Sequence, residues 1–420
     1  MSTEPGPKTP AAAAPEMDPA FETQEPAGLY LHVPYCSAVC PYCDFAVRRG
    51  DGDRADAFAE VLIREIRDVA SGAVAPPDDP APSRALGRLA TSTFDTVYLG
   101  GGTPSLLGGD PLAEVLGAVT DVFDLDPGAR LFFEANPENV DDPRLARWRD
   151  LGVSVLSLGV QSFDDGELKF LGRRHSGREA VVAVERALAA GLGTVSVDLI
   201  YGLPDQTLEG WSRSLEQAIA LGPDHLSLYE LEVNEGTPFF KQRRRGELTE
   251  LDEDLQAELF HHTHTRLGEA GFESYEACSF ARAPRHRSRH NGKYWRHAPY
   301  LGLGPSAHSF AAGVRMWNER LEPRWRKRVN AGQSAVAGFE SLTAEGFILE
   351  ALMLGLRTMG GVDLGDLRRR TGIDLATPNR DRIERWRDAG WLHEGDGPHL
   401  RPTRLGLAVA DRLATELSVP

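Results

Sequence analysis

Cysteine is scarce in this sequence, with four residues among 420. That number is too small for the disulfide framework on which small secreted proteins depend. Long apolar runs are also missing, because no stretch approaches the roughly 20 apolar residues that a membrane-spanning helix needs. Basic charge is short as well, since 46 Lys and Arg against 62 Asp and Glu give a net charge of -16. The composition therefore argues against a disulfide scaffold, an integral membrane protein and a general nucleic-acid binder.

The start of the chain lacks the basic residues and the apolar centre of a secretory signal. Residues 1–27 are instead rich in Pro, Ala and acidic side chains, which is typical of a disordered tail. We therefore expect a cytoplasmic protein whose folded part begins near residue 28.

Apolar runs rich in Val, Leu, Tyr and Phe recur from residue 29 onward and alternate with amphipathic stretches of helical period. Six such runs occupy residues 29–33, 94–100, 130–135, 153–160, 194–202 and 225–233. Helix candidates include residues 55–70 and 176–191, and the second begins at a Ser cap and ends at a Gly. Strands that alternate with helices predict an α/β fold with a parallel sheet, either open or curved into a full or partial barrel.

Polar and glycine residues gather where the predicted strands end. Glycines 100–102 close or follow the second strand, Glu134 lies near the end of the third, Gln161 follows the fourth and Asp198 lies late in the fifth. The carboxyl ends of parallel strands meet at one edge of a sheet, where ligands bind. We expect these residues to share one site, together with the cysteines that follow the first strand.

Three of the four cysteines, Cys36, Cys40 and Cys43, lie within eight positions and have no fourth cysteine nearby. They could belong to a zinc site, to a redox pair with a spare thiol, or to an iron-sulfur cluster. Structural zinc needs four ligands, and the nearest further candidates, His32 and Asp44, lie on or beside the same loop. A 4Fe-4S cluster usually takes four cysteines, so three would leave one iron open to a substrate or cofactor.

At these residues the chain resembles the radical S-adenosylmethionine (SAM) enzymes. Their CxxxCxxC signature matches the three cysteines, with Tyr42 just before the third. The stretches "YLHVPYC", "GGGTPS", "DLIYGLP", "RHNGKYW" and "YLGLGPSAHSF" are similar to the branch that contains the anaerobic coproporphyrinogen dehydrogenases (HemN) and the haem chaperones (HemW). The resemblance implies a partial β/α barrel of about six parallel strands, followed by a C-terminal winged-helix-like α+β domain.

The resemblance also implies a 4Fe-4S cluster on the three cysteines, whose fourth iron binds the amino and carboxylate groups of SAM. It assigns the remaining SAM contacts to Tyr30, Tyr42, Gly101, Gly102, Thr103, Glu134, Gln161, Arg173 and Asp198. Glu134 suits the ammonium group of SAM, and Arg173 suits the carboxylate through a forked ion pair. Such enzymes use one electron from a donor to cleave SAM into methionine and a radical that abstracts hydrogen.

Two features separate the chaperone from the dehydrogenase. The dehydrogenases carry another cysteine two positions after the third, and here that position is Phe45. Residues 282–300 contain arginines and histidines without any acidic residue, which on composition alone fits a solvated loop equally well. Within this run His290, Asn291, Tyr294 and Trp295 resemble the HNxxYW pattern associated with haem binding. They would offer an axial imidazole and flat apolar faces.

The resemblance thus implies a haem chaperone that carries haem to apoproteins, some of them bound to membranes, so that the protein would work at the membrane periphery. The alternatives are an oxygen-independent coproporphyrinogen III dehydrogenase or another tetrapyrrole-directed oxidoreductase, and a zinc-binding interaction module. Whether the chain is an enzyme stays open. The predicted domains are a tail (1–27), a radical SAM barrel (28–275), a connecting segment with HNxxYW (276–335) and a C-terminal domain (336–420).

Overall fold

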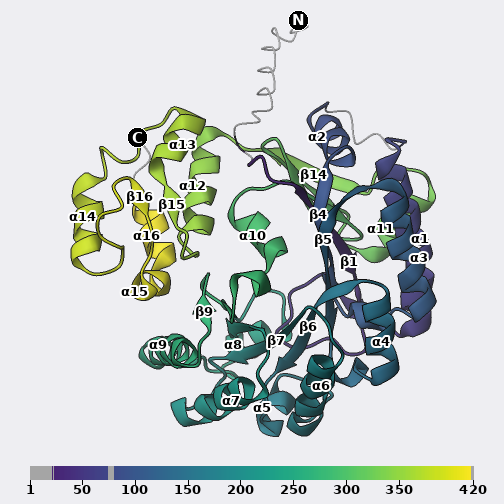
Figure 1. Ribbon diagram of the computed structural model, residues 1–420, viewed down its shortest axis with the longest axis horizontal. Coiled ribbons are helices and arrows are strands. Elements are labelled where there is room, and N and C mark those ends of the chain that lie inside the picture. Colours follow the sequence, from purple (N-terminus) through teal and green to yellow (C-terminus); the bar gives the residue numbers. More distant parts are fainter. Residues whose placement is uncertain (1–20, 22, 74–79, 418–420) are drawn as a thin grey trace, which may run out of the picture.

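The computed structural model describes residues 21, 23–73 and 80–417, which form a large curved sheet with its helices and a smaller helical unit (Figure 1). Among these residues the large sheet has twelve strands, and its central seven are parallel. In spatial order these seven are β11 (Tyr300–Leu303), β1 (Ala27–Val33), β4 (Thr93–Gly101), β5 (Asp124–Ala135), β6 (Val153–Gln161), β7 (Thr194–Tyr201) and β8 (His225–Glu230). The six predicted strands are confirmed, and β11 is a seventh that the sequence did not predict.

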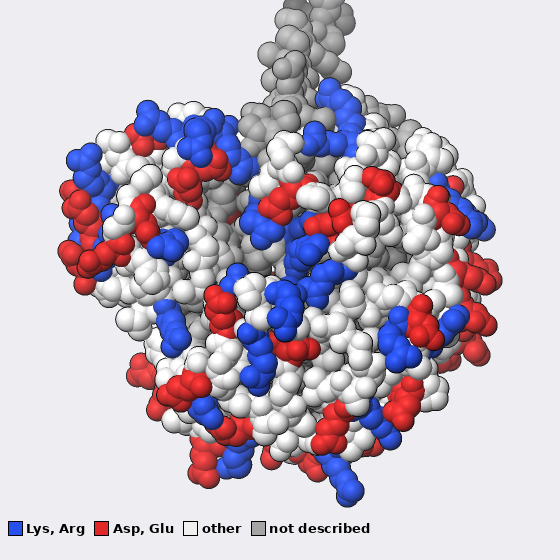
Figure 2. Space-filling view, viewed as in Figure 1, with Lys and Arg blue, Asp and Glu red and all other residues white. Residues whose placement is uncertain are grey.

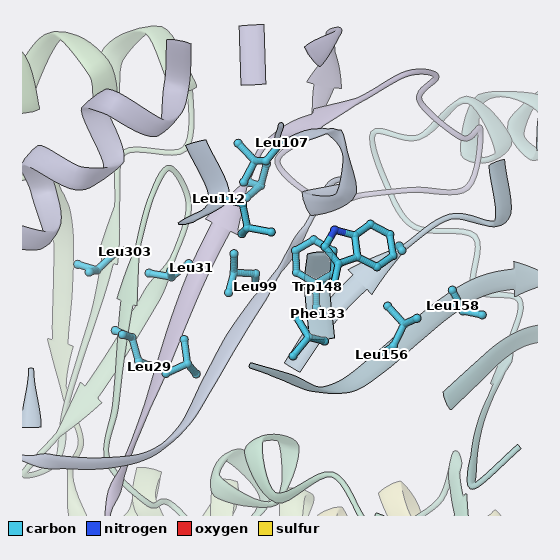
Figure 3. Close-up of a cluster of buried hydrophobic side chains, with 14 of the residues drawn as sticks. Leu29, Leu31, Leu99, Leu107, Leu112, Phe133, Trp148, Leu156, Leu158 and Leu303 are labelled. Carbon is cyan, nitrogen blue, oxygen red and sulfur yellow. The ribbon is translucent and has the colours of Figure 1, made fainter. Parts of the chain in front are cut away.

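The parallel strands are buried on both faces, which explains why they read as continuous apolar runs. Leu29 and Leu31 of β1 point toward the helices, while Tyr30 and His32 alternate to the opposite face. Figure 3 shows the helix-facing layer, with Leu29, Leu31 and Leu99 on neighbouring strands. Trp148 covers Phe133 in the same layer, with ring centroids 5.0 Å apart.

Helices connect the parallel strands and cover the outer face of the sheet (Figure 1). They are α1 (Gly52–Ala70), α2 (Pro80–Ala90), α3 (Gly109–Val122), α4 (Asp142–Asp150), α5 (Asp165–Phe170), α6 (Gly177–Ala189) and α7 (Leu208–Leu221). The predicted helix at 176–191 is confirmed. The Ser176 hydroxyl accepts a hydrogen bond from the Glu179 amide, and the Glu179 carboxylate accepts one from the Ser176 amide. The helix predicted at 55–70 begins slightly earlier, at an Asp51 cap.

The two ends of the sheet are antiparallel and come from chain segments after β8. One end carries β10 (Ser279–Ala281) and β9 (Glu273–Ser274), and the other carries β12 (His308–Ala311), β13 (Val314–Asn318) and β14 (Val336–Ser341). Within the described residues β9 and β14 do not pair with each other, so the barrel is partial. Residues 276–335, predicted as a connecting segment, therefore build part of the sheet, and β14 places residue 336 in the sheet instead of in the C-terminal unit.

Four further helices belong to this large unit. They are α8 (Pro238–Arg244), α9 (Glu253–Glu269), α10 (Arg289–Trp295) and α11 (Glu322–Asn330). Helix α10 differs from the rest because it lies on the inner face, against β1 and β4, and also touches the C-terminal unit through α12 (Ala344–Gly355). In Figure 1 it occupies the middle of the view, between the sheet and the smaller unit.

The C-terminal unit has its own apolar core and a two-stranded sheet, as expected for a winged-helix-like α+β domain. After α12 it contains β15 (Val362–Asp363), α13 (Leu364–Thr371), α14 (Arg380–Asp388), β16 (His399–Leu400), α15 (Arg404–Ala408) and α16 (Ala410–Glu416). None of the described helices is long and apolar enough to span a membrane.

Part of the predicted disordered tail is ordered. Phe21 is buried and stacks on Phe347 of α12, with ring centroids 4.8 Å apart. Glu25 pairs with Arg296 at 2.7 Å. The prediction is therefore wrong for residues 21 and 23–27, because apolar and charged partners from the end of the chain hold them, whereas residues 1–20 and 22 lie outside the described residues.

Candidate functional site

The three clustered cysteines lie on a short loop at the carboxyl end of β1. Cys36 ends the two-residue strand β2 (Tyr35–Cys36), which pairs with β3 (Arg48–Arg49), and its carbonyl accepts the Gly50 amide at 2.9 Å. All three are half-buried free thiols. Burial raises the pKa of Cys36 to about 11 and also raises the pKa of Cys43, and the neighbouring thiols add to both effects. A bound metal would lower these pKa values again, because it stabilises the thiolate forms.

The arrangement of ligand-type side chains bears on which metal could bind. Across residues 21, 23–73 and 80–417, no three His, Cys, Asp or Glu side chains are grouped to hold a single metal ion. A structural zinc ion needs four such ligands around one centre. An iron-sulfur cluster instead takes each thiolate on a separate iron. Three thiolates match the ligand set of a cluster that leaves one iron open.

Arg173 joins the cysteine loop to the ends of the neighbouring strands. Its Nη1 donates to Cys40 Sγ at 3.6 Å, and its Nη2 donates to Asn136 Oδ1 at 2.6 Å and to the Gly159 carbonyl at 2.7 Å. Asn136 in turn donates to the Thr103 hydroxyl at 3.1 Å. The buried Nε of Arg173 has no hydrogen-bond partner among the described residues, so one guanidinium donor remains available to an anionic group.

Asn136 is a residue that the sequence reasoning missed. It directly follows β5, so the same rule that selected Glu134 near a strand end could have selected it. Its side chain links Arg173 to Thr103, two residues that the resemblance assigns to the SAM site. The amide therefore connects the two sides of the candidate site.

Two half-buried carboxylates lie on the inner face, Glu134 on β5 and Asp198 on β7. Glu134 accepts hydrogen bonds from the Tyr98 hydroxyl at 2.6 Å and from the Gly101 amide at 3.1 Å. Burial raises its pKa to about 7, and the charge of Asp198 adds to the effect. Burial likewise raises the pKa of Asp198 to about 6, although the Ser157 hydroxyl donates to it at 2.9 Å. A cationic ligand would stabilise both ionised forms.

The glycine turn after β4 has a structural role of its own. Gly101 has φ of 102°, in the left-handed region, and a Cβ on Gly102 would lie 2.6 Å from the Tyr35 carbonyl oxygen. The Gly102 amide donates to the Val33 carbonyl at 2.7 Å, which ties the turn to the cysteine loop. These contacts require glycine here whether or not a ligand approaches.

Gln161 and Tyr42 complete the predicted SAM residues near the cysteines. Gln161 ends β6 with φ of 68°, which is rare for a residue with a side chain. Its buried Oε1 has no hydrogen-bond partner in the described part of the chain, so it could accept a bond from a ligand. Tyr42 packs against Phe239, with 6.4 Å between the ring centroids.

The HNxxYW segment differs from the prediction of an accessible loop. His290 is 1% exposed on α10, with Nδ1 2.9 Å from the Thr96 hydroxyl and Nε2 2.9 Å from the Tyr294 hydroxyl. Burial lowers its pKa to about 3, so the ring is neutral. Both nitrogens are engaged because α10 packs onto β1 and β4, so His290 presents no open ring nitrogen in this structure, and its predicted role as a haem ligand stays a prediction. Asn291 and Trp295 are half-buried on the same helix.

The basic residues around α10 divide into exposed and buried ones. Figure 2 shows basic side chains gathered near the middle of this face, where Figure 1 places α10. The exposed ones in the run are Arg282, Arg285, Arg289 and Arg296. Lys293 is instead buried, with Nζ 2.6 Å from Asp95 Oδ1 and donating to the Pro26 carbonyl at 2.6 Å. The run is therefore not a solvated loop.

Tyr30 lies apart from the hydrogen-bonded cysteine network, in a cavity of about 330 Å³ on the inner face. The cavity is lined by Tyr30, His32, Asp44, Phe45, Ala46, Tyr294, Tyr300, Ser306, Ala307, His308 and Arg320. His308 and Arg320 were missed by the sequence reasoning, although His308 stands in the quoted stretch "YLGLGPSAHSF". The loop that follows the third cysteine thus forms one wall of this cavity.

Comparison with known proteins assigns a family to each of the two units. Residues 30–218 match the radical SAM superfamily, and residues 342–409 match the HemN C-terminal domain. The fold is similar to the structure titled coproporphyrinogen III oxidase (HemN) from Escherichia coli, with a TM-score of 0.76 over 94% of this chain and 91% of that chain. At 20% sequence identity that likeness shows the fold alone.

Other proteins have sequences that are more similar to this chain than that of the Escherichia coli structure. The heme chaperone HemW of Mycobacterium tuberculosis is 38% identical over 346 residues, 82% of this chain and 84% of that protein. The mouse mitochondrial radical S-adenosyl methionine domain-containing protein 1 is 36% identical over 342 residues, 81% of this chain and 70% of that protein. These extents confirm the resemblance seen in the sequence, and the chain belongs to the radical SAM superfamily, in the family of proteins named heme chaperone HemW.

Proposed function

We propose that this chain is a haem chaperone that holds a 4Fe-4S cluster and SAM and delivers haem to proteins that require it. The observation that carries the proposal is the similarity, along 82% of the chain, to a protein named heme chaperone. Phe45 supports it, because it stands where the resembling dehydrogenases have a further cysteine. The proposal includes a cytoplasmic location, peripheral to the membrane when the recipient is membrane-bound.

The proposed cofactor residues follow from the donor set. Cys36, Cys40 and Cys43 would hold the cluster, which with SAM supplies one-electron chemistry when an electron donor reduces it. The Nε of Arg173, which has no partner in the part of the chain that the structure describes, is suited to the SAM carboxylate, and Glu134 is suited to its ammonium group.

The other proposed SAM contacts surround these groups. Gln161 and Asp198 would bind the ribose hydroxyls. Gln161 Oε1 has no hydrogen-bond partner within the described residues, and Asp198 is an acceptor on the next strand. The backbone at Gly101 and Gly102, with Thr103, Tyr42 and Tyr30, would form the rest of the pocket.

The test uses anaerobically purified chain with the cluster intact and Cys36→Ser as the variant without it. Haem is titrated onto each and followed by absorbance, and transfer to an apo-haem protein is then measured. We expect saturable binding and transfer by the intact protein, and no protoporphyrinogen from coproporphyrinogen with SAM and a reductant. Absence of haem binding in both forms, or formation of protoporphyrinogen, would contradict the proposal. Cys278→Ser is the matched control, because its thiol lies far from the cysteine loop in sequence.

A further inference from the structure

Three histidines surround the cavity that contains Tyr30, and they differ in whether a ring nitrogen is open. His32 lines the cavity, but its Nδ1 is 3.0 Å from the Tyr30 hydroxyl and its Nε2 is 3.2 Å from the Ala46 carbonyl. His290 lies behind Tyr294 with both nitrogens in hydrogen bonds. His308 also lines the cavity, and its ring has no hydrogen bond within the described residues. Among these three histidines, His308 is therefore the one whose ring nitrogens are available to a ligand.

The position of His308 suits a metal ligand. It is the first residue of β12 and is exposed, with its ring centroid 6.1 Å from that of Trp317 on the adjacent strand β13. Desolvation of the ring lowers its pKa, which keeps the imidazole neutral, and neutral imidazole is the form that binds iron. The loop before it is fixed, because Glu65 accepts the Gly304 amide at 2.7 Å and the Asn318 amide at 2.9 Å.

The remaining walls suit a flat, anionic macrocycle. Three tyrosines, Tyr30, Tyr294 and Tyr300, line the cavity, and Phe45 at its edge is 62% exposed, so its ring is open to contact by a ligand. Arg320 is exposed on the same cavity, and its Nη2 donates to the Asp44 carbonyl at 3.0 Å. Aromatic faces beside an exposed guanidinium match a tetrapyrrole ring with carboxylate side chains.

We infer that His308 is the axial ligand of the haem iron, that Phe45, Tyr294 and Tyr300 contact the ring, and that Arg320 pairs with a propionate. The inference rests on the proposed function and names the site that function would use. The HNxxYW segment then has a positioning role, since His290 orients the hydroxyl of Tyr294, which forms one wall.

The size and place of the cavity fit a carrier. Its volume of about 330 Å³ is at the lower end of the range for small-molecule sites, so a haem would lie partly outside it, where a recipient protein could reach the ring. Asp44 and Phe45 directly follow Cys43, so the haem would touch the loop that also carries a proposed cluster ligand. Haem binding and cluster state should therefore influence each other.

The experiment compares His308→Ala with His393→Ala in the full chain with its cluster, using haemin as the probe. His393 is the control because it is an exposed histidine of the C-terminal unit. Haem affinity is measured by absorbance titration, and the iron–histidine stretch of the reduced complex is measured by resonance Raman. We expect His308→Ala to lose that band and to weaken affinity beyond the roughly 10- to 100-fold typical of losing a group that only orients a metal ligand. Added imidazole should restore the band, and Arg320→Gln should weaken binding without removing it.

Several results would overturn the inference. Unchanged affinity and spectrum in His308→Ala would do so, as would loss of the band in His290→Gln while His308→Ala keeps it. A fold defect is excluded as the cause if His308→Ala keeps the circular dichroism and the iron content of the unmodified protein. If the unmodified chain binds no haem, the proposed function itself is overturned. If it binds haem and the binding does not depend on His308, only the assignment of the ligand is overturned.

Discussion

The buried ion pair between Lys293 and Asp95 allows a quantitative prediction for Lys293→Met. The ammonium group is 2.6 Å from Asp95 Oδ1 and donates to the Pro26 carbonyl at 2.6 Å, and Lys293 is 1% exposed. A Cβ on Gly28 of β1 would lie 2.8 Å from the Lys293 stem, so the stem packs closely on the strand. Methionine keeps an unbranched stem and removes the charge, leaving the carboxylate without its main partner.

The loss of stability in Lys293→Met depends on which groups still compensate the charge of Asp95. Removing one partner of a buried pair costs about 3–5 kcal/mol. Asp95 is 14% exposed, and Arg289 Nη1 lies 3.7 Å from its other oxygen, so its charge is not left isolated. We therefore expect the lower end, a loss of about 3 kcal/mol in the free energy of opening β1 and β4. Adding Asp95→Asn should recover most of this loss, because the unpaired charge is then gone.

Hydrogen exchange measured by mass spectrometry on peptides from β1 and β4 reports this opening free energy. Local exchange is preferable to whole-chain unfolding because multidomain proteins do not unfold in one two-state step. Lys327→Met is the matched control, since Lys327 is an exposed lysine on α11. If Lys293→Met differs from this control by less than about 0.5 kcal/mol, the usual range for surface substitutions, the reasoning is refuted.

Three further predictions concern the proposed cofactor site. Cys36→Ser should lose most bound iron and sulfide, whereas Cys278→Ser should keep both. Chemical analysis that finds a 2Fe-2S centre or zinc in the unmodified protein would contradict the cluster assignment. Glu134 has a folded-state pKa of about 7, above its ordinary value of 4.5, so its protonated form favours the fold and this stabilisation falls as pH rises from about 4.5 to 7. Binding the SAM ammonium should therefore release protons below about pH 7, as calorimetry in buffers of different ionisation enthalpy would show, and Glu134→Gln should abolish that release. Phe45→Cys alone should yield no protoporphyrinogen, because a whole substrate pocket and not one thiol defines the dehydrogenase; measurable product would disprove this.

The parts of the fold that the sequence predicted are those with a local signal. Parallel strands covered on both faces leave long apolar runs, and so β4 and β6 to β8 could be located within a few residues, whereas β5 begins six residues before its predicted start. Strand ends could be located with them, which brought Glu134 and Gln161 to attention together. The cysteine loop was the clearest case, because its ligands are close in sequence as well as in space.

The parts that could not be predicted depend on distant partners. Strand β11 has four residues, one of them glycine, and its position is set by pairing with β1. The run around His290 reads as a solvated loop, yet the Lys293 charge is compensated by Asp95 and by the Pro26 carbonyl, neither of which is near in sequence. His308 stands in a stretch that resembles the family, but a single histidine acquires meaning only from the cavity around it.

The pairing of β1 with β11 has a consequence for how the chain folds during synthesis. Strand β1 is among the first folded segments to be made, but one of its two neighbours ends only at Leu303. At about 5–20 residues per second, synthesis of the intervening chain takes roughly a quarter of a minute to a full minute. During that time one edge of β1 has unpaired backbone groups and can attract other strands. We therefore expect nascent chains that stop before β11 to bind chaperones and aggregate, and chains extended past Leu303 to become resistant to protease.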